Sequence, residues 1–228
     1  MKKVAIFDVD GTIFRSSLLI ELTEAMISSG LFKPSVRRHY AKHYQNWLNR
    51  KGSYEKYINA VVEVFEKNIK GKKFKDFLKI SKKVISLKQD HIYEYTRDLI
   101  KDLKKRGCFL LAISNSPKLT VDYFCQQLGF DKTYGRMREL DEKGVFTGKL
   151  MHEEIIWNKA KVLKRAMGKE GLTLKNSFAV GDTESDIPLF KMVDYPICFN
   201  PNKKLYNVAK KNGWKVVVER KDMIYEIN

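Results

Sequence analysis

The fold is decided by residues 4–12, which read VAIFDVDGT. The first four residues of this stretch are apolar, as in a strand buried on both faces, and the run stops at Asp8. Ligands of open α/β sheets bind beyond the carboxyl ends of the strands, which is where Asp8 and Asp10 lie. Residues two apart on an extended chain share a face, so both carboxylates can point to one site. Their mutual repulsion predicts a compensating cation, and Mg²⁺ is the usual partner of clustered carboxylates.

Two later predicted strands also lead into polar residues. Residues 109–113 lead into SNSP at 114–117, and residues 177–180 lead into GDTESD at 181–186. Parallel strands with helical crossovers would bring these ends and the first two aspartates to one edge of a sheet. A serine followed by a proline also predicts a helix start, with Ser116 as the capping residue.

The segment between the first and second strands shows helical periodicity only. Apolar and aromatic residues recur there at helical spacing, which predicts helices with aromatic inner faces. The chain is therefore predicted to be an α/β core of parallel strands, residues 1–14 and 91–228, with an all-helical insert at 15–90. The core includes a predicted hairpin whose turn is DEKG, residues 141–144.

Length and composition place limits on the class of protein. The chain has 228 residues, of which 43% are hydrophobic and 31% charged, as in a globular protein with one core and a smaller insert. No apolar run is long enough to cross a bilayer and the first residues enter a strand, so we expect a cytoplasmic protein without a membrane partner. Three widely spaced cysteines, in neither CxxC nor zinc spacing, predict buried thiols in a reducing compartment: Cys108, Cys125 and Cys198.

The polar ends of the second and third strands suit a phosphate and a metal ion. Ser114 and Asn115 precede a predicted helix, whose N-terminal amides favour anions, so both are candidate phosphate ligands. Asp182 lies on a Gly-Asp turn and is a candidate to complete a metal site with Asp8.

A positive side chain is still needed to offset the charge of a phosphate and a nucleophile. Lys159, at the start of a predicted helix, is the first candidate, and Lys161 and Lys164 are nearby rivals. Each candidate also has a simpler interpretation: Ser114 as a strand-end hydroxyl, the lysine as a surface residue, and the Asp182 loop as a helix cap. The joint occurrence of all of them at strand and helix boundaries favours an active site.

Together these motifs resemble those of the haloacid dehalogenase-like (HAD) phosphohydrolase superfamily. The resemblance rests on DVDGT at 8–12, ISNS at 113–116, Lys-Ala at 159–160 and GDTESD at 181–186. The stretch at 200–214 and the position of the helical insert are similar to the phosphoserine phosphatase-like branch, subfamily IB. The resemblance implies a Rossmann-like core with an all-helical cap, dependence on Mg²⁺, and phosphoryl transfer through an aspartyl-phosphate.

The resemblance also implies a role for each motif residue. Asp8 would be the nucleophile, and Asp10 would protonate the leaving alcohol and then take a proton from the attacking water. The groups that hold the phosphoryl oxygens would be Ser114, Asn115 and Lys159.

The same resemblance implies the ligands of the metal ion. Mg²⁺ would be held by Asp8, by the backbone carbonyl of Asp10 and by Asp182. Asp186 would orient these ligands from outside the coordination sphere. Mg²⁺ is thus the predicted cofactor.

The predicted activity is phosphatase action on a small phosphorylated metabolite. Enzymes of this branch that hydrolyse phosphoserine place a glutamate a few residues after the first motif, where it holds the amine of the substrate. Here Ser17 stands at the best-aligned position, and Glu21 lies one helical turn further on. The segment 15–94 has 17 lysines and arginines against 8 acidic residues, a net charge of +9, which suits a negative or polar leaving group. Phosphoserine is therefore a candidate substrate but not a favoured one, and the insert is expected to select the leaving group.

Two other functions remain open from the sequence. A phosphotransferase would use the same intermediate and pass the phosphoryl group to an acceptor alcohol. A nucleic-acid-binding or end-processing protein is suggested by the net charge of +17, but no nucleic-acid motif is present, so a nucleic-acid partner is not expected. His39 and His43 lie one helical turn apart without a third ligand, so we interpret them as surface histidines.

Overall fold

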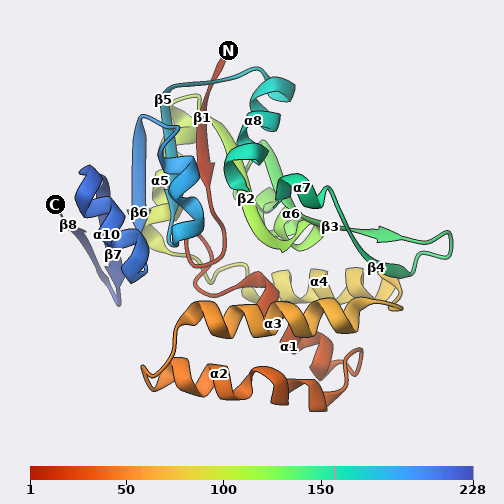
Figure 1. Ribbon diagram of the computed structural model, residues 1–228. Helices are drawn as coiled ribbons and strands as arrows, with labels where there is room; N and C mark the ends of the chain where they lie inside the picture. Colours follow the sequence, from red (N-terminus) through yellow and green to blue (C-terminus); the bar gives the residue numbers. More distant parts are fainter. Residues whose placement is uncertain (157, 228) are drawn as a thin grey trace. The chain divides into compact units, whose positions relative to one another are not determined.

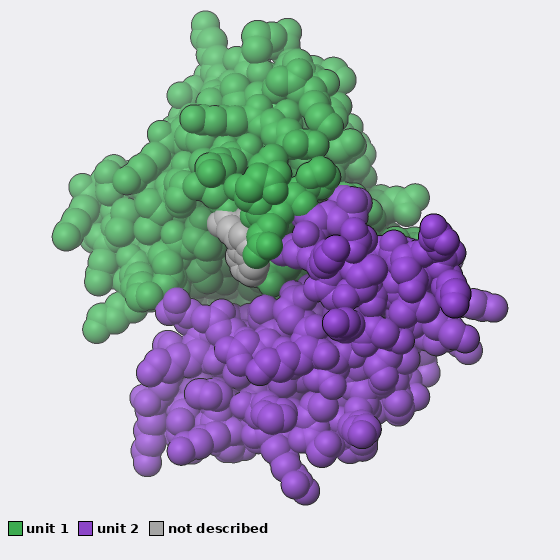
Figure 2. Space-filling model, turned by 45° about the vertical axis from the view of Figure 1, so that its right-hand side comes forward, with its two compact units in different colours: residues 1–17, 89–136, 152–228 green, residues 18–88, 137–151 purple. Residues whose placement is uncertain are grey.

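The computed structural model describes residues 1–156 and 158–227, and the chain divides into two compact units (Figure 2). The α/β unit, green in Figure 2, comprises Met1–Ser17, Gln89–Arg136 and His152–Asn228. The helical unit, purple in Figure 2, comprises Leu18–Lys88 and Met137–Met151. Each unit is described separately below.

The sheet of the α/β unit is parallel except at its last strand, β8, which runs antiparallel to β7. Its order is β3-β2-β1-β5-β6-β7-β8. The central strand β1 pairs with β2 on one side and with β5 on the other, and its residues Val4 to Phe7 are fully buried. The strand bounds are β1 Lys2–Phe7, β2 Phe109–Pro117, β3 Lys132–Leu140, β5 Leu172–Gly181, β6 Tyr195–Phe199, β7 Lys215–Arg220 and β8 Met223–Ile227.

Helices cover both faces of this sheet, as right-handed crossovers between parallel strands require. In Figure 1 the helices α8, α9 and α10 lie in front of the sheet, and α5 and α6 lie behind it. The helix bounds in this unit are α5 Glu94–Lys105, α6 Lys118–Gln127, α7 Glu153–Ile156, α8 Lys159–Glu170, η2 Glu184–Asp186, α9 Ile187–Phe190 and α10 Lys203–Asn212. This architecture confirms the predicted α/β fold with a Rossmann-like parallel sheet.

The helical unit is built around aromatic rings. Phe65 is fully buried and meets Phe32 edge-on at 6.0 Å, and Trp47 stacks on the buried Tyr57 at 5.8 Å. These contacts agree with the interpretation of the aromatic stripes as core residues. The elements are α1 Leu18–Ser28, η1 Pro34–Arg37, α2 Arg38–Leu48, α3 Tyr54–Ile69, α4 Phe74–Lys88 and the outer hairpin of β3 with β4 Phe146–Met151.

The outer hairpin, residues 137–151, groups with the helical unit, whereas the predicted division assigned these residues to the core and only 15–90 to the insert. Phe146 packs edge-on against Phe77 of α4 at 5.3 Å. Arg138 lies over the ring of Phe65 at 4.7 Å and pairs with Glu66 of α3. These contacts link two segments far apart in sequence, and a pattern read along the chain does not reveal them. The turn at 141–144 itself is where the sequence predicted it, with the Gly144 amide donating to the Asp141 carbonyl at 3.0 Å.

One boundary and one strand also differ from the sequence analysis. The strand β2 continues through the SNSP stretch to Pro117, so α6 begins at Lys118 without a side-chain cap. The edge strand β8 was not predicted, because all of its residues are exposed and it lacks a buried face. The prediction of buried thiols is confirmed for Cys108, Cys125 and Cys198.

Candidate active site

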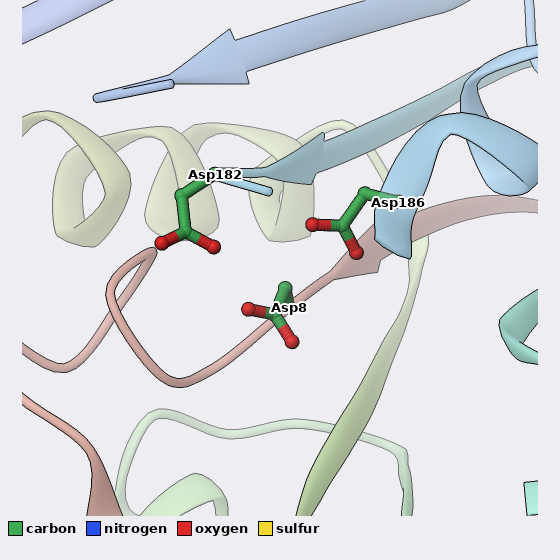
Figure 3. A group of neighbouring side chains, drawn as sticks. All are labelled: Asp8, Asp182 and Asp186. Atoms are coloured by element: carbon green, nitrogen blue, oxygen red, sulfur yellow. The ribbon is translucent and has the colours of Figure 1, made fainter. Parts of the chain in front are cut away.

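Three carboxylates converge where β1 and β5 end (Figure 3). Asp8 follows the last residue of β1, and its amide donates to the carbonyl of Val180 at 2.9 Å. Asp182 follows the last residue of β5, and Asp186 lies on the short helix η2. Each of the three aspartates offers an oxygen within 4.8 Å of the others. The adjacent parallel strands therefore bring Asp8 together with Asp182, which follows it by 174 residues.

Two glycines leave room for these carboxylates. Gly11 has a φ of +80°, and a Cβ atom there would collide with the Asp182 carboxylate. A Cβ atom at Gly181 would collide with the carboxylate of Asp186. The glycines in DVDGT and in the Gly-Asp turn are thus required by close packing around the acidic cluster.

Lys159 joins two of the three carboxylates. Its Nζ lies 2.6 Å from Oδ1 of Asp8 and 2.5 Å from Oδ1 of Asp186, and the lysine is only 4% exposed. It is the first residue of α8, where the side chain of Asn158 caps the helix by accepting from the amides of residues 160 and 161. The rival candidates Lys161 and Lys164 are exposed on the same helix.

Burial and like charge together control the ionisation of this cluster. Loss of hydration raises the pKa of Asp8 to about 7, and the neighbouring Asp186 and Asp10 act in the same direction against the opposing effect of Lys159. Loss of hydration and the charges of Asp8 and Asp186 also raise the pKa of Asp182 well above its usual value. Burial alone would lower the pKa of Lys159, but its two carboxylate partners raise it above the ordinary value. Lys159 therefore stays charged, while Asp8 and Asp182 hold protons more tightly than usual.

The donor set fits a hard divalent cation. All the groups of the trio are carboxylates, the ligand type that Mg²⁺ prefers. One lysine does not compensate three ionised acids, as the raised pKa values of Asp8 and Asp182 indicate. Asp186 also offers an oxygen to the trio, and its predicted place outside the metal ligands stays a prediction. The backbone carbonyl of Asp10 as a ligand stays a prediction.

The Asp10 side chain points to β2 rather than to the acidic trio. Its Oδ2 accepts from the hydroxyl of Ser114 at 2.6 Å, and its Oδ1 accepts from the hydroxyl of Ser116 at 2.9 Å. Asn115, between the two serines, is half-buried. The predicted role of Ser116 as a helix cap is wrong, because its hydroxyl is bonded to Asp10 and α6 starts two residues later.

Thr12 and Ser116 are candidate functional residues that the sequence analysis missed. The Thr12 hydroxyl lies 3.4 Å from the Asp182 carboxylate and 3.5 Å from that of Asp8. Both residues stood inside the quoted motifs, and Ser116 lies two residues after Ser114 on an extended chain. That alternation was the available signal, but the Ser-Pro pair favoured a helix start instead.

The histidine pair of the helical unit does not add to a metal site. His39 is exposed and His43 half-buried, and both line a depression of about 310 Å³ between α2 and α3. Across the described residues, the acidic trio is the group of three or more potential ligands that lies close enough to hold one ion. None of the described helices is long and apolar enough to span a membrane.

Comparison with known proteins gives consistent matches. The family model of haloacid dehalogenase-like hydrolases matches residues 5–191. The chain is 24% identical to a histidinol-phosphatase of Neisseria meningitidis over 225 residues, which cover 95% of this chain and 99% of the relative. It is 25% identical to a phosphoserine phosphatase of Methanocaldococcus jannaschii over 223 residues, 97% of this chain and 94% of the relative. A solved phospho-aspartyl intermediate analogue of phosphoserine phosphatase has the same fold, with a TM-score of 0.62, 24% identity, and coverage of 97% and 95%.

Proposed function

Because this chain belongs to the haloacid dehalogenase-like hydrolases, in their phosphoserine phosphatase-like branch, we propose that it is a Mg²⁺-dependent phosphatase of small phosphorylated metabolites. Family membership confirms the resemblance and the enzyme class predicted from the motifs. Beyond the enzyme class, we propose that the protein uses Mg²⁺ and a covalent aspartyl-phosphate intermediate, with the residue roles given below.

One observation carries the proposal: the contact of the buried Lys159 with both Asp8 and Asp186. Removing a lysine and two carboxylates from water costs free energy that an apolar cluster of the same size would not cost. Such a cluster at the carboxyl ends of parallel strands supports a catalytic role. Asp182 adds a third carboxylate, with an oxygen within 4.8 Å of those of Asp8 and Asp186.

Mg²⁺ would be held by Asp8, by Asp182 and by the backbone carbonyl of Asp10, with Asp186 orienting these groups and fixing Lys159. The ion would neutralise charge on the carboxylates and on the phosphate oxygens. The raised pKa values of Asp8 and Asp182 support this assignment, since a nearby cation would let both acids ionise at neutral pH.

The reaction proceeds in two displacements at phosphorus. An oxygen of Asp8 forms a bond to phosphorus while the bond to the leaving oxygen breaks, and Asp10 gives that oxygen a proton. Water then attacks the phosphorus of the aspartyl-phosphate, Asp10 takes up its proton, and the bond to Asp8 breaks to release inorganic phosphate. The developing charge on the phosphoryl oxygens is stabilised by Ser114, Asn115 and Lys159.

Phosphoserine is not the favoured substrate in this proposal. Ser17 has no charge for an ammonium group, and it is 3% exposed. Glu21, the other acid near the first motif, already pairs with Lys88 at 3.3 Å. An ammonium-bearing substrate would have to compete with that lysine for the Glu21 carboxylate.

Phosphate release from a panel of phosphomonoesters tests the proposal. The panel contains phosphoserine, sugar phosphates, glycerol phosphates and nucleotides, each measured with Mg²⁺ and with a chelator. We expect Mg²⁺-dependent release, with a higher kcat/KM for another substrate than for phosphoserine. Full activity in the chelator would contradict the metal site, and a clear preference for phosphoserine would contradict the substrate assignment. Transfer of the phosphoryl group to an added alcohol in place of water would identify a phosphotransferase.

A further inference from the structure

Both oxygens of the Asp10 carboxylate accept a hydrogen bond from a serine of β2. Ser114 donates to Oδ2 at 2.6 Å and Ser116 donates to Oδ1 at 2.9 Å. The two serines are two apart on an extended strand and so share one face. They are 1% and 2% exposed, respectively. The Asp10 carboxylate is thus fixed in orientation by two buried hydroxyl groups.

The two hydroxyl groups are not equivalent in the proposed reaction. A serine hydroxyl has one proton to donate. Ser114 is the proposed phosphate ligand, so its proton must leave Oδ2 of Asp10 when it turns to a phosphoryl oxygen. Its oxygen also accepts the backbone amide of Ser116 at 2.9 Å, which keeps the hydroxyl in place while the proton changes partner. Ser116 has no such second task in the reaction.

We propose that Ser116 is a positioning residue that holds Oδ1 of Asp10 after Ser114 has turned to the phosphate. Oδ2, which Ser114 has released, is then the oxygen that gives its proton to the leaving group as the bond from phosphorus to that group breaks. In the second step the same oxygen takes the proton of the attacking water. This inference rests on the proposed function, and it adds a residue for which neither the motifs nor the family comparison gives a role.

Structural roles account less well for Ser116. It does not cap α6, which begins at Lys118 after Pro117 and has no side-chain cap. Ser177 of β5 is an example of a buried serine with a structural role. It is fully buried and donates to the backbone carbonyl of Leu174. Ser116 instead donates to an ionisable group at the reaction centre.

The dependence of rate on the leaving group tests the inference. An alkyl phosphate needs a proton on its departing oxygen, whereas p-nitrophenyl phosphate releases a stable phenolate without one. The parameter to measure is kcat/KM, because it includes only the steps up to departure of the alcohol or phenol. For Ser116→Ala we expect kcat/KM to fall about 10-fold or more for glycerol phosphate and less than about 3-fold for p-nitrophenyl phosphate.

Three variants serve as controls. Ser177→Ala removes an equally buried hydroxyl remote from the site. It should change kcat/KM by the same factor for both substrates. Ser116→Thr keeps the hydroxyl and should restore the wild-type ratio between the two substrates. If Ser116→Ala does not fold, Ser116→Cys keeps the side-chain size with a weaker donor, and the same selective loss is expected.

Two results overturn the inference, and they are distinguishable. If kcat/KM fell by the same factor for both substrates in folded Ser116→Ala or Ser116→Cys, Ser116 would be a structural residue. The proposed phosphatase function would be unaffected by that result. Absence of phosphate release from either substrate by the wild-type protein would instead contradict the proposed function itself, and the role of Ser116 with it.

Discussion

The two units differ in how far their most buried ion pairs are shielded from water. In the α/β unit, Lys159, Asp8 and Asp186 are each at most 5% exposed and contact one another directly. In the helical unit, each ion pair that the structure describes includes at least one side chain that is one quarter exposed or more. In the pair of Arg37 with Glu24, for example, the exposed fractions of the two side chains are 43% and 40%. Water therefore screens the pairs of the helical unit but not the cluster of the α/β unit.

This difference bears on the proposed catalytic role of the buried cluster. A buried lysine between carboxylates is less stabilising than an apolar cluster of the same volume, so stability does not explain its presence. The helical unit gains its stability from rings such as Phe65 and Tyr57, and its charged groups contribute little. The predictions below test this contrast.

The largest effect is expected for the proposed nucleophile. Asp8→Asn should lower kcat by about 10⁴-fold or more, since an amide oxygen does not form the covalent intermediate. The protein should remain folded, because Lys159 keeps Asp186 as a partner and asparagine keeps the shape of the side chain. Steady-state phosphate release together with circular dichroism checks both statements. Appreciable turnover by a folded Asp8→Asn protein would exclude the covalent mechanism.

The second prediction compares two lysines of the same helix. Lys159→Met should lower the free energy of unfolding by about 3–5 kcal/mol, because it leaves buried carboxylates without their cation. Lys161→Met, at an exposed position two residues later, should change it by less than about 0.5 kcal/mol. Urea unfolding of both variants in the chelator gives the two values. A similar loss of unfolding free energy in both variants would show that burial of Lys159 does not distinguish it from an exposed lysine.

The third prediction concerns pH and Mg²⁺. The pKa of Asp8 is about 7 in the folded protein against an ordinary value of 3.8, so folding favours its protonated form. The resulting contribution to stability is complete below pH 4 and is lost as the pH rises to 7. Mg²⁺ should compensate the ionised acids, and should raise Tm by about 4 °C more at pH 8 than at pH 5.5.

Melting curves with Mg²⁺ and with a chelator, recorded at both pH values, measure this difference. Asp182→Asn is the matched variant, since it removes one carboxylate of the trio and should reduce the Mg²⁺-dependent shift at pH 8. A shift of the same size at both pH values would contradict the proposal that these acids hold the ion.

Much of the α/β unit could be predicted because its signals are local. The run that ends at Asp8 is marked by its own burial, and Gly181 is required by close packing against Asp186, five residues later. The helix that presents Lys159 was predicted in the same way from its periodicity, and it begins at that lysine. Such features are visible along the chain and can be interpreted without its tertiary structure.

The features that were missed depend on contacts between distant segments. Residues 137–151 join the helical unit through Arg138 and Phe146, whose partners lie about 70 residues earlier. Ser116 was assigned by local preference to a helix cap, and the hydrogen bond to Asp10, 106 residues away, overrides that preference. Local propensity is a weak guide where hydrogen bonds between distant segments set the geometry.

The smallest effect is expected at the ion pair between Arg37 and Glu24. The Arg37 guanidinium lies 2.8 Å from the Glu24 carboxylate, to which the hydroxyl of Tyr40 also donates. Because both charged side chains remain about two-fifths exposed, water solvates each of them after the pair is broken. Arg37→Ala should therefore lower the free energy of unfolding by less than about 1 kcal/mol, measured by urea unfolding as for the lysine variants. A loss of 3 kcal/mol or more would mean that the helical unit also depends on buried charge, and the contrast between the two units would then be lost.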